Sequence, residues 1–277
     1  MKLLVTGGSG YVGAGILRRA PKEWRIAATY FAHPLGRADV AAFRVDVRDA
    51  NAVNRLFDEF SPTVVIHTAA VMTGGEMMAT NAEGSRNLAR AAARARARLI
   101  HLSSDVIFDG QHAPYAETAV PAPITPYAES KARAEQVVQA AHPQPLLVRT
   151  SLVYGFAPLD SRTRQTLAGG MPRLFADEYR CPIFVDDLAD GLIELAQNDS
   201  GGVLNIAGPK RLSRYEFGVK FARAFRVEPR FQPALCASSP TPRPRDCTLD
   251  VSLAQRQLKT RLRGVDEVLA HCLIVTA

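Results

Sequence analysis

Short apolar segments alternate with amphipathic segments along this chain, at the spacing typical of α/β proteins. Continuous apolar runs predict buried parallel strands, because a strand covered by helices on both faces has no solvent-facing positions. Strands are expected at Lys2–Thr6, Arg25–Thr29, Phe43–Val47, Thr63–Ala70, Arg98–Asp105, Leu146–Gly155 and Gly201–Gly208. Helices are expected at Tyr11–Arg19, Asn51–Phe60, Asn81–Ala97 and Tyr127–Ala141, and within Pro182–Gln197. The alternation predicts an α/β fold with a parallel sheet.

The rest of the chain is patterned less regularly. We expect the chain to pass into a second lobe at the end of the strand Leu146–Gly155. Residues 156–180 show no clear periodicity and are expected to form part of a lid. The segment Gln232–Arg245 is rich in proline, which has no backbone N–H, so we expect a loop there.

Two helices of this second half carry N-cap signals. Asp186 or Asp187 precedes apolar residues at helical spacing, and either can cap the helix that follows. Ser213 precedes the expected helix Arg214–Phe225, and Glu216 stands three residues after Ser213. This spacing predicts a capping box, in which the two side chains satisfy free backbone amides reciprocally.

Glycines recur at three-residue spacing directly after the first expected strand. In the sequence TGGSGYVG, Gly7 allows a tight turn, Gly10 lets the backbone approach a pyrophosphate, and Gly13 lets the next helix pack close to the sheet. Tyr11 and Val12 start that helix, whose N-terminus favours phosphate charge. The pattern predicts that these five residues bind a dinucleotide.

The end of the second strand bears on the choice of cofactor. An Asp or Glu there would hydrogen-bond the adenosine ribose of NAD. This chain has Thr29 and Tyr30 instead, and no acid before Asp39. Arg37 is close enough in sequence to meet a 2′-phosphate, although it could equally face solvent. The pattern favours NADP(H) over NAD(H).

Two further strand ends are expected at the cofactor crevice. Asp46 and Val47 end the third strand, and the small residues Ala69 and Ala70 end the fourth, where they would let a cofactor approach. Parallel strands place their carboxyl ends at one edge of the sheet. All four residues are therefore predicted to bind the cofactor.

A tyrosine and a lysine lie one helical turn apart in the sequence PYAESK. Tyr127 and Lys131 fall on one face of the expected helix. Lysine is scarce, with 6 Lys against 28 Arg, so a basic position without special requirements would usually hold arginine. The lysine ammonium shifts its pKa readily when buried. Together with the glycine motif the pair indicates hydride chemistry on a nicotinamide cofactor, although such pairs also occur on solvated helix faces.

Composition narrows the class of protein. The chain has 277 residues, 47% hydrophobic content and a net charge of +7. Nucleic-acid binding is disfavoured, because the arginines at positions 90, 94, 96 and 98 alternate with alanine and no stacking aromatic residue lies between them. No apolar run reaches the 18 or so residues of a membrane span. The four cysteines lack metal-ligand spacing, so we expect no metal and a cytoplasmic protein with reduced thiols.

Several segments resemble the extended short-chain dehydrogenase/reductase family, and within it the dTDP-4-dehydrorhamnose reductase group. They are SSDVIFDG, PAPITPYAESKARAE, RTSLVYG, FVDDLADG, GGVLNIAGPKRLSRYEF and RPRDCTLD. The resemblance implies a Rossmann-type doubly wound sheet with a smaller C-terminal α/β lobe. We expect the dinucleotide-binding domain to comprise residues 1–155, with 182–208 returning to it. The substrate-binding lobe would comprise residues 156–181 and 209–277.

The resemblance also implies catalytic roles. Tyr127 would donate a proton to a substrate carbonyl, Lys131 would hold the nicotinamide ribose, and Ser104 would hydrogen-bond the carbonyl oxygen. Free tyrosine titrates near pH ~10, too high for efficient catalysis at neutral pH. An ammonium about 4 Å away contributes roughly 4 kcal/mol at an effective dielectric constant near 20. We therefore expect Lys131 to lower the pKa of Tyr127.

Three substrate-side features depart from the rhamnose-forming reductases that this chain resembles. Those enzymes usually carry a tyrosine after the aspartate of the Ser104-Asp105 motif, where this chain has Val106. They usually carry a tryptophan in the sixth-strand motif, where this chain has Leu152. Their acidic stretch after the fourth strand is replaced by residues 71–76. Asp105, Val106 and Leu152 are the predicted substrate-binding residues, and the departures put dTDP-sugar specificity in question.

Two functions remain open. The first is an NADPH-dependent reductase acting on the ketone of a nucleotide-linked keto-sugar or a similar polar carbonyl compound by a Ser-Tyr-Lys mechanism, as a monomer or homodimer. The second is a non-catalytic NADP-binding regulatory subunit, because the regulatory subunit of methionine adenosyltransferase resembles this chain in SSDVIFDG, PYAE and RPR. A dehydratase is disfavoured because Val106 replaces its second acid, and a 4-epimerase because strand two ends without an acid.

Overall fold

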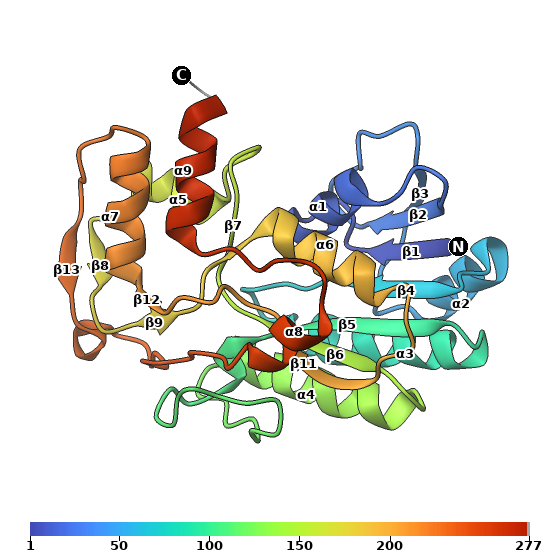
Figure 1. Cartoon of the computed structure of the whole chain (residues 1–277). Helices are drawn as coiled ribbons and strands as arrows, with labels where there is room; N and C mark the ends of the chain where they lie inside the picture. Colours follow the sequence, from blue (N-terminus) through green and yellow to red (C-terminus); the bar gives the residue numbers. More distant parts are fainter. Residues whose placement is uncertain (276–277) are drawn as a thin grey trace.

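A parallel seven-stranded β-sheet forms the centre of the computed structural model, which describes residues 1–275, with side-chain burial described as far as His271 (Figure 1). The strand order β11-β6-β5-β4-β1-β2-β3 shows that the chain starts in the middle and winds outward in both directions. Every neighbouring pair in the sheet is parallel. The strands are β1 (Lys2–Thr6), β2 (Arg25–Tyr30), β3 (Ala41–Arg44), β4 (Val64–His67), β5 (Arg98–Ser104), β6 (Leu146–Thr150) and β11 (Gly202–Asn205).

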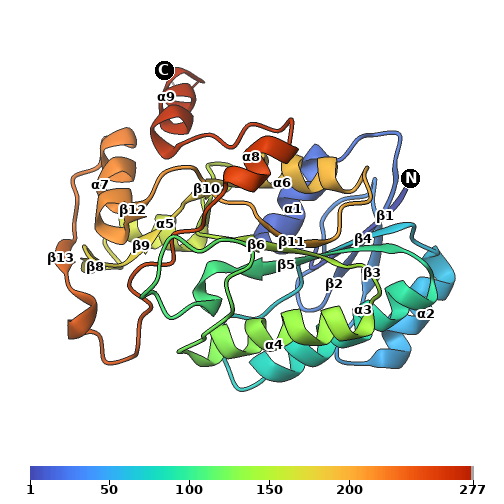
Figure 2. The same cartoon turned by 60° about the horizontal axis from the view of Figure 1, so that its bottom comes forward.

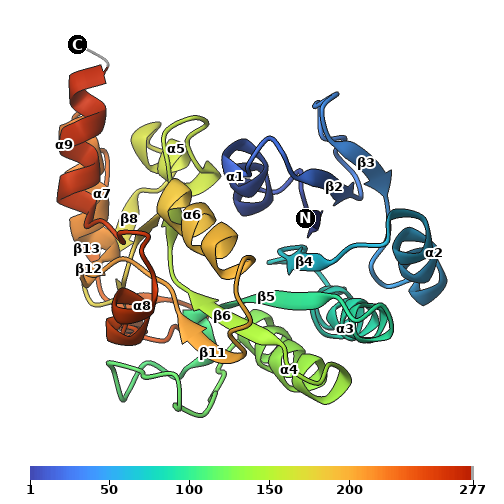
Figure 3. The same cartoon turned by 45° about the vertical axis from the view of Figure 1, so that its right-hand side comes forward.

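Helices cover both faces of this sheet (Figure 3). Alternate residues of β1 pack on opposite faces of the sheet, because successive side chains of a strand point in opposite directions. Leu4 packs with the core under α2 and α3, whereas Leu3 and Val5 pack with the core under α1 and α6. One face carries α2 (Ala50–Phe60), α3 (Gly84–Arg94) and α4 (Pro126–Ala141), and the other α1 (Tyr11–Arg19), α6 (Val185–Leu195) and α8 (Ser252–Gln257). The doubly wound Rossmann-type fold is confirmed.

A smaller lobe lies beyond the end of the sheet where β6 leads out of it (Figures 1 and 2). Its core is aromatic: the Tyr154 ring lies 5.5 Å from that of Phe217 and 5.4 Å from that of Phe221. Its strands pair as β7 (Val153–Tyr154) with β10 (Ile183–Phe184), β9 (Tyr179–Arg180) with β12 (Leu212–Ser213), and β8 (Arg173–Phe175) with β13 (Gln232–Ala234). Its helices are α5 (Ser161–Leu167), α7 (Arg214–Ala224) and α9 (Val265–Val275).

The division of the chain between the two lobes stays a prediction, and residues 276–277 lie outside the described residues. Strand β11, in the segment expected to return to the first domain, pairs with β6 in the central sheet. Ala254 and Leu258 belong to the segment expected in the substrate-binding lobe, yet they pack into the core of the sheet.

Several expected elements differ from the structure. The third strand covers Ala41–Arg44, so Asp46 and Val47 lie in the turn after it. The sixth strand ends at Thr150, and β7 starts after a two-residue break. The helix expected at Asn81–Ala97 is a π-helix over Met78–Glu83 followed by α3. Residues 156–180, which show no clear periodicity in the sequence, contain α5, β8 and β9, and their expected role as part of a lid stays a prediction.

The two N-cap predictions have opposite outcomes. The capping box of Ser213 and Glu216 is confirmed, with both reciprocal hydrogen bonds present. The cap by Asp186 or Asp187 is wrong, because α6 begins at Val185 and both acids lie in its first turn. Asp187 instead accepts hydrogen bonds from Arg263, 76 residues further along the chain. Among the described residues, none of the helices has the length and apolar character that crossing a membrane requires.

Candidate active site

The glycine motif forms a tight turn between β1 and α1. Gly7 has a φ of 71°, and a Cβ on it would lie 2.8 Å from the Ala69 Cα. A Cβ on Gly13 would lie 2.2 Å from the Gly7 carbonyl oxygen, so glycine is required for α1 to start this close to the turn. Gly10 caps α1 without a side-chain hydrogen bond, which leaves amides of the first turn for an anion. These residues fit the pyrophosphate of a dinucleotide.

Three other predicted cofactor residues support this turn. The buried hydroxyl of Thr29 accepts a hydrogen bond from the Gly7 N–H at 3.1 Å, so Thr29 holds the turn in shape. The Tyr11 hydroxyl donates to the carbonyl oxygen of Pro158 at 3.1 Å. Val12 packs against the core of the sheet. The turn is thus tied both to β2 and to the segment that leads into α5.

Two arginines lie near the ends of β2 and β3. Arg37 is already paired: its Nε donates to Asp39 at 3.0 Å, and its Nη1 donates to the Leu17 carbonyl oxygen at 2.7 Å. Arg44 stands opposite the last residue of β2 in the register of the sheet. Its Nε donates to the Phe31 carbonyl oxygen at 3.3 Å, and it forms no ion pair within residues 1–275. Arg44, not Arg37, is the cation without a carboxylate partner at this end of the sheet.

The predicted cofactor residues after β3 and β4 have mixed surroundings. The Asp46 carboxylate accepts a hydrogen bond from Arg48 Nη2 at 2.6 Å, which lowers the pKa of that carboxyl. Arg48 also pairs with Glu76. Val47 is buried, whereas Ala70 is exposed. Direct contact of these residues with a cofactor stays a prediction.

Ser104 and Tyr127 lie near one another at the start of α4. Ser104 is the last residue of β5, and Tyr127 is the second residue of α4, which Thr125 caps. Burial and the nearby charge of Asp105 raise the pKa of the Tyr127 phenol to about 12, and they outweigh the lowering by the neighbouring Ser104 hydroxyl. The phenol is therefore protonated at neutral pH.

Lys131 lies one turn further along α4 and is 3% exposed. Its Nζ donates to the Leu102 carbonyl oxygen at 2.8 Å. Burial lowers the pKa of the ammonium to about 8. Lys131 is not among the groups that shift the pKa of Tyr127. The expected lowering of the tyrosine pKa is absent, because burial of the phenol dominates and the ammonium is directed at β5.

The whole chain matches one family of known proteins. The family model described as the RmlD substrate binding domain matches residues 1–276. The chain is 33% identical to a dTDP-4-dehydrorhamnose reductase of Mycobacterium tuberculosis, over 100% of this chain and 93% of the relative. The chain belongs to the RmlD substrate binding domain family. The predicted family is confirmed, and the protein is an NAD(P)-dependent oxidoreductase of the extended short-chain type.

Other proteins similar to this RmlD-family protein include a subunit of methionine adenosyltransferase and a reductase of known structure. It is 27% identical to methionine adenosyltransferase 2 subunit beta of Xenopus tropicalis, over 92% of this chain and 82% of the relative. Its fold is similar to the crystal structure of a dTDP-4-dehydrorhamnose reductase from Bacillus anthracis in complex with NADP, with a TM-score of 0.85, 22% identity and coverage of 100% and 99% of the two chains.

The predicted substrate residues of this RmlD-family protein have different surroundings. Val106 is partly buried directly after the Ser104-Asp105 pair. Leu152 packs against the aromatic core of the small lobe, and with Phe217 and Phe221 it lines a narrow cavity there. A larger side chain at position 152 would therefore meet the small lobe.

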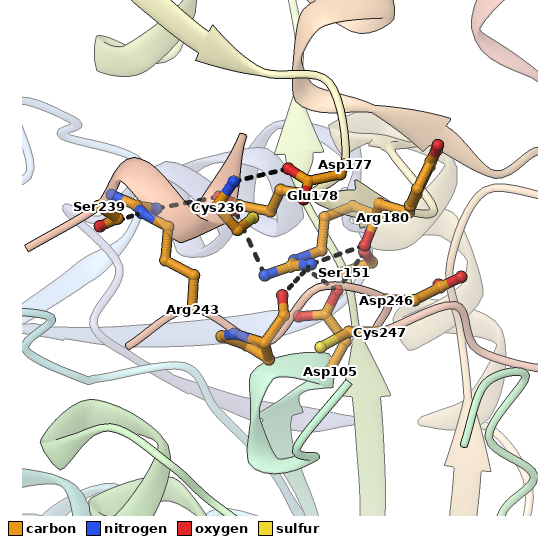
Figure 4. Close-up of polar contacts among 12 residues, drawn as sticks. Asp105, Ser151, Asp177, Glu178, Arg180, Cys236, Ser239, Arg243, Asp246 and Cys247 are labelled. Atoms are coloured by element: carbon orange, nitrogen blue, oxygen red, sulfur yellow. Dashed lines mark hydrogen bonds and ion pairs between the residues drawn. The ribbon is translucent and has the colours of Figure 1, made fainter. Parts of the chain in front are cut away.

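Asp105 is held inside the protein by several side chains (Figure 4). It is 3% exposed, and its Oδ2 accepts a hydrogen bond from the Ser151 hydroxyl. The Nε of Arg180 lies 3.7 Å from the same carboxylate, and Ser104 donates to its Oδ1 at 3.3 Å. Arg180 also lies 3.3 Å from Glu178, so the ion pairs of the small lobe reach Asp105 and, through it, Ser104. Contact of Asp105 with a substrate stays a prediction.

Sequence analysis missed Asn81, which lies in the π-helix and is fully buried. Its side chain exchanges two hydrogen bonds of 2.8 Å with the backbone of Val71. Its Nδ2 also donates to the Ser130 hydroxyl at 2.9 Å, between Tyr127 and Lys131 on α4. π-helical turns inside helices are frequent at functional sites. No local pattern could reveal Asn81, because Ser130 lies 49 residues away.

Proposed function

We propose that this protein is an NADPH-dependent reductase that transfers hydride to the ketone of a nucleotide-linked keto-sugar or a similar polar carbonyl compound. The observation that carries the proposal is the placement of Ser104, at the end of β5, near the Tyr127 phenol on α4, with Lys131 one turn away. Two neighbouring hydroxyl groups can bind one carbonyl oxygen and stabilise the negative charge that develops on it. The glycine turn beside them fits a dinucleotide.

Each side chain of the proposed site has a distinct role in the reaction. NADPH, when bound, supplies the hydride. Ser104 donates a hydrogen bond to the substrate oxygen as it becomes negative. Tyr127 transfers its phenolic proton to that oxygen, since a phenol with a pKa of about 12 is protonated at neutral pH yet more acidic than an aliphatic alcohol. We assign Lys131 to the nicotinamide ribose, whose hydroxyls can accept from a buried ammonium.

The preference for NADPH over NADH rests on charge at the end of β2. The ribose of NAD is usually bound by an Asp or Glu there, and residues 29–38 include neither. We propose that Arg44 contacts the 2′-phosphate, because it forms no ion pair within the described residues. Arg37, the sequence-based choice, is neutralised by Asp39.

Turnover with purified protein tests the reductase proposal. The substrate panel should include the dTDP-linked 4-keto-6-deoxysugar and unlinked polar ketones, with NADPH absorbance as the readout and NADH in parallel. Tyr127→Phe is the inactive reference, and Tyr215→Phe, which replaces a partly buried tyrosine of α7, is the control. Turnover that survives Tyr127→Phe but not Tyr215→Phe would contradict the proposed site.

A regulatory role is the second candidate, and the relatedness to methionine adenosyltransferase 2 subunit beta favours it. The two candidates differ in what cofactor binding achieves. A protein that binds NADPH, reduces no member of the panel, and changes the kinetics of a methionine adenosyltransferase catalytic subunit would be regulatory. Turnover of any ketone by the native chain, abolished by Tyr127→Phe, would favour the reductase.

A further inference from the structure

A continuous chain of buried hydrogen bonds starts at the last residue of β1. The Thr6 hydroxyl lies 2.5 Å from Nδ1 of His67, on the neighbouring strand β4. Nε2 of His67 lies 2.9 Å from the Ser85 hydroxyl on α3. The Ser85 hydroxyl donates to the Asn81 carbonyl oxygen at 2.5 Å. These four residues are each at most 1% exposed, so the protein itself must satisfy their polar atoms.

The chain continues from Asn81 to the catalytic helix. The Asn81 side chain donates to the Ser130 hydroxyl at 2.9 Å, and that hydroxyl donates to the Tyr127 carbonyl oxygen at 2.7 Å. Ser130 is fully buried and precedes Lys131 directly. One path of hydrogen bonds therefore links Thr6, which precedes the glycine turn, to Tyr127.

Counting protons along this path fixes the direction of every bond. A carbonyl oxygen can only accept, so the Ser85 hydroxyl donates its single proton to the Asn81 carbonyl oxygen. In its contact with His67 Nε2, the Ser85 oxygen must therefore be the acceptor. His67 is then protonated on Nε2. Burial and the nearby Lys131 lower the pKa of its imidazole to about 3, so the ring is neutral and Nδ1 is an acceptor. The Thr6 hydroxyl must donate to it.

His101 shows that burial alone does not produce such a path. It lies opposite His67 in the register of β4 and β5, with 5.2 Å between the ring centroids, and it is equally buried. Neither of its ring nitrogens has a hydrogen-bond partner in the part of the chain that the structure describes. The two histidines thus share burial, sheet face and proximity to Lys131, and differ in the hydrogen bonds that they form.

We propose that His67 is a positioning residue that fixes the catalytic helix relative to the cofactor turn, through a one-directional hydrogen-bond path from Thr6 to Tyr127. The inference rests on the proposed reductase function. Hydride transfer requires the cofactor and the proton donor to be held in a fixed relative position. A misplacement of about 1 Å can lower the rate roughly 100-fold. A neutral imidazole suits this role, because it donates on one side and accepts on the other without adding charge beside Lys131.

The experiment compares His67→Leu and Thr6→Val with His101→Leu as the matched control. Thr6→Val keeps the shape of the side chain and removes only the donor, which covers the case in which His67→Leu does not fold. We expect kcat to fall roughly 10- to 100-fold in both test variants, with the Kd for NADPH changed less than about threefold. Thr6→Ser should restore kcat, and His101→Leu should retain it.

Nitrogen NMR of the imidazoles provides a readout independent of turnover. His67 should show a protonated Nε2 and an unprotonated Nδ1 from pH 5 to pH 9, and Thr6→Val should shift both His67 and the Asn81 side-chain amide. A proton on Nδ1 would overturn the inference, as would equal losses of kcat in His101→Leu and His67→Leu. If no substrate is turned over, the reductase proposal fails, while these NMR signals still decide whether the path exists.

Discussion

The Nζ of Lys131 donates to the carbonyl oxygen of Leu102 at 2.8 Å, and this bond directs the ammonium at β5 instead of at the phenol of Tyr127. The pKa values of the two side chains are therefore set by different surroundings. The pKa of Tyr127 is raised by burial and by Asp105, whereas the pKa of Lys131 is lowered by burial. The pair of Tyr127 and Lys131 therefore combines a phenol that stays protonated with an amine that titrates near neutral pH.

The lowered pKa of Lys131 makes stability depend on pH. Between the folded-state pKa of about 8 and the reference value of 10.5, the unfolded chain binds the extra proton. The free energy of unfolding should therefore rise with pH in this window, by roughly 3 kcal/mol at full titration, at 1.36 kcal/mol per pKa unit. Urea unfolding of the native protein and Lys131→Met between pH 7 and 9.5 measures the difference. If the free energy of unfolding changes with pH equally in the two proteins, burial does not lower the pKa of Lys131.

Tyr127→Phe should lower kcat by about 1,000-fold or more, because it removes the only proposed proton donor. The Kd for NADPH should change less than about threefold, since the proposed ribose contact is Lys131. Stopped-flow absorbance and calorimetric titration measure the two quantities. Lys131→Ala should damage both. Substantial turnover in Tyr127→Phe would refute the mechanism and support the regulatory alternative.

Arg44→Ala and Arg37→Ala separate the two arginines near the end of β2. We expect Arg44→Ala to weaken NADPH binding by about 10-fold or more, as expected for loss of a charged hydrogen bond worth roughly 1.5–3 kcal/mol, and to leave NADH unchanged. Arg37→Ala should affect both cofactors equally and slightly, because Arg37 is bound to Asp39 and to α1. A selective loss of NADPH affinity in Arg37→Ala would restore the sequence-based choice.

Sequence predicted the features of this site that depend on neighbours along the chain. The glycine turn, the capping box of Ser213 and the helical pairing of Tyr127 with Lys131 all follow from residues within one or two turns. The start of α6 could not be predicted, because Asp187 is taken by the distant Arg263. The surroundings of Asp105 could not be predicted either, since Ser151 lies 46 residues away. Long-range contacts have no local signature.

A buried ion pair anchors α4 to the sheet behind the site. The Nη2 of Arg149 lies 2.8 Å from Glu135, and both side chains are 4% exposed. Glu135→Ala should lower the free energy of unfolding by about 3–5 kcal/mol, because it leaves a buried guanidinium without its carboxylate. The control is Glu83→Ala, which breaks the more exposed pair with Arg86 and should cost about 1 kcal/mol or less. Equal losses in urea unfolding would show that burial does not govern the cost.

The last prediction concerns substrate choice at positions 106 and 152. We propose that Val106 and Leu152 weaken binding of the usual dTDP-linked ketone, since neither can hydrogen-bond or stack on a sugar nucleotide. An aromatic contact is worth roughly 0.5–1.5 kcal/mol beyond the area it buries, so each lost contact costs up to about tenfold.

The two positions differ in how freely they can change. Leu152 already packs against the aromatic core of the small lobe, so Leu152→Trp alone risks crowding Phe217 and Phe221. Val106→Tyr alters a partly buried position beside Ser104. We therefore expect Val106→Tyr to raise kcat/KM for the dTDP-linked ketone by about tenfold, and Leu152→Trp to add a further gain only if thermal unfolding shows that the small lobe tolerates it. Efficient turnover of this ketone by the native protein, with no gain in either variant, would show that these positions do not set specificity.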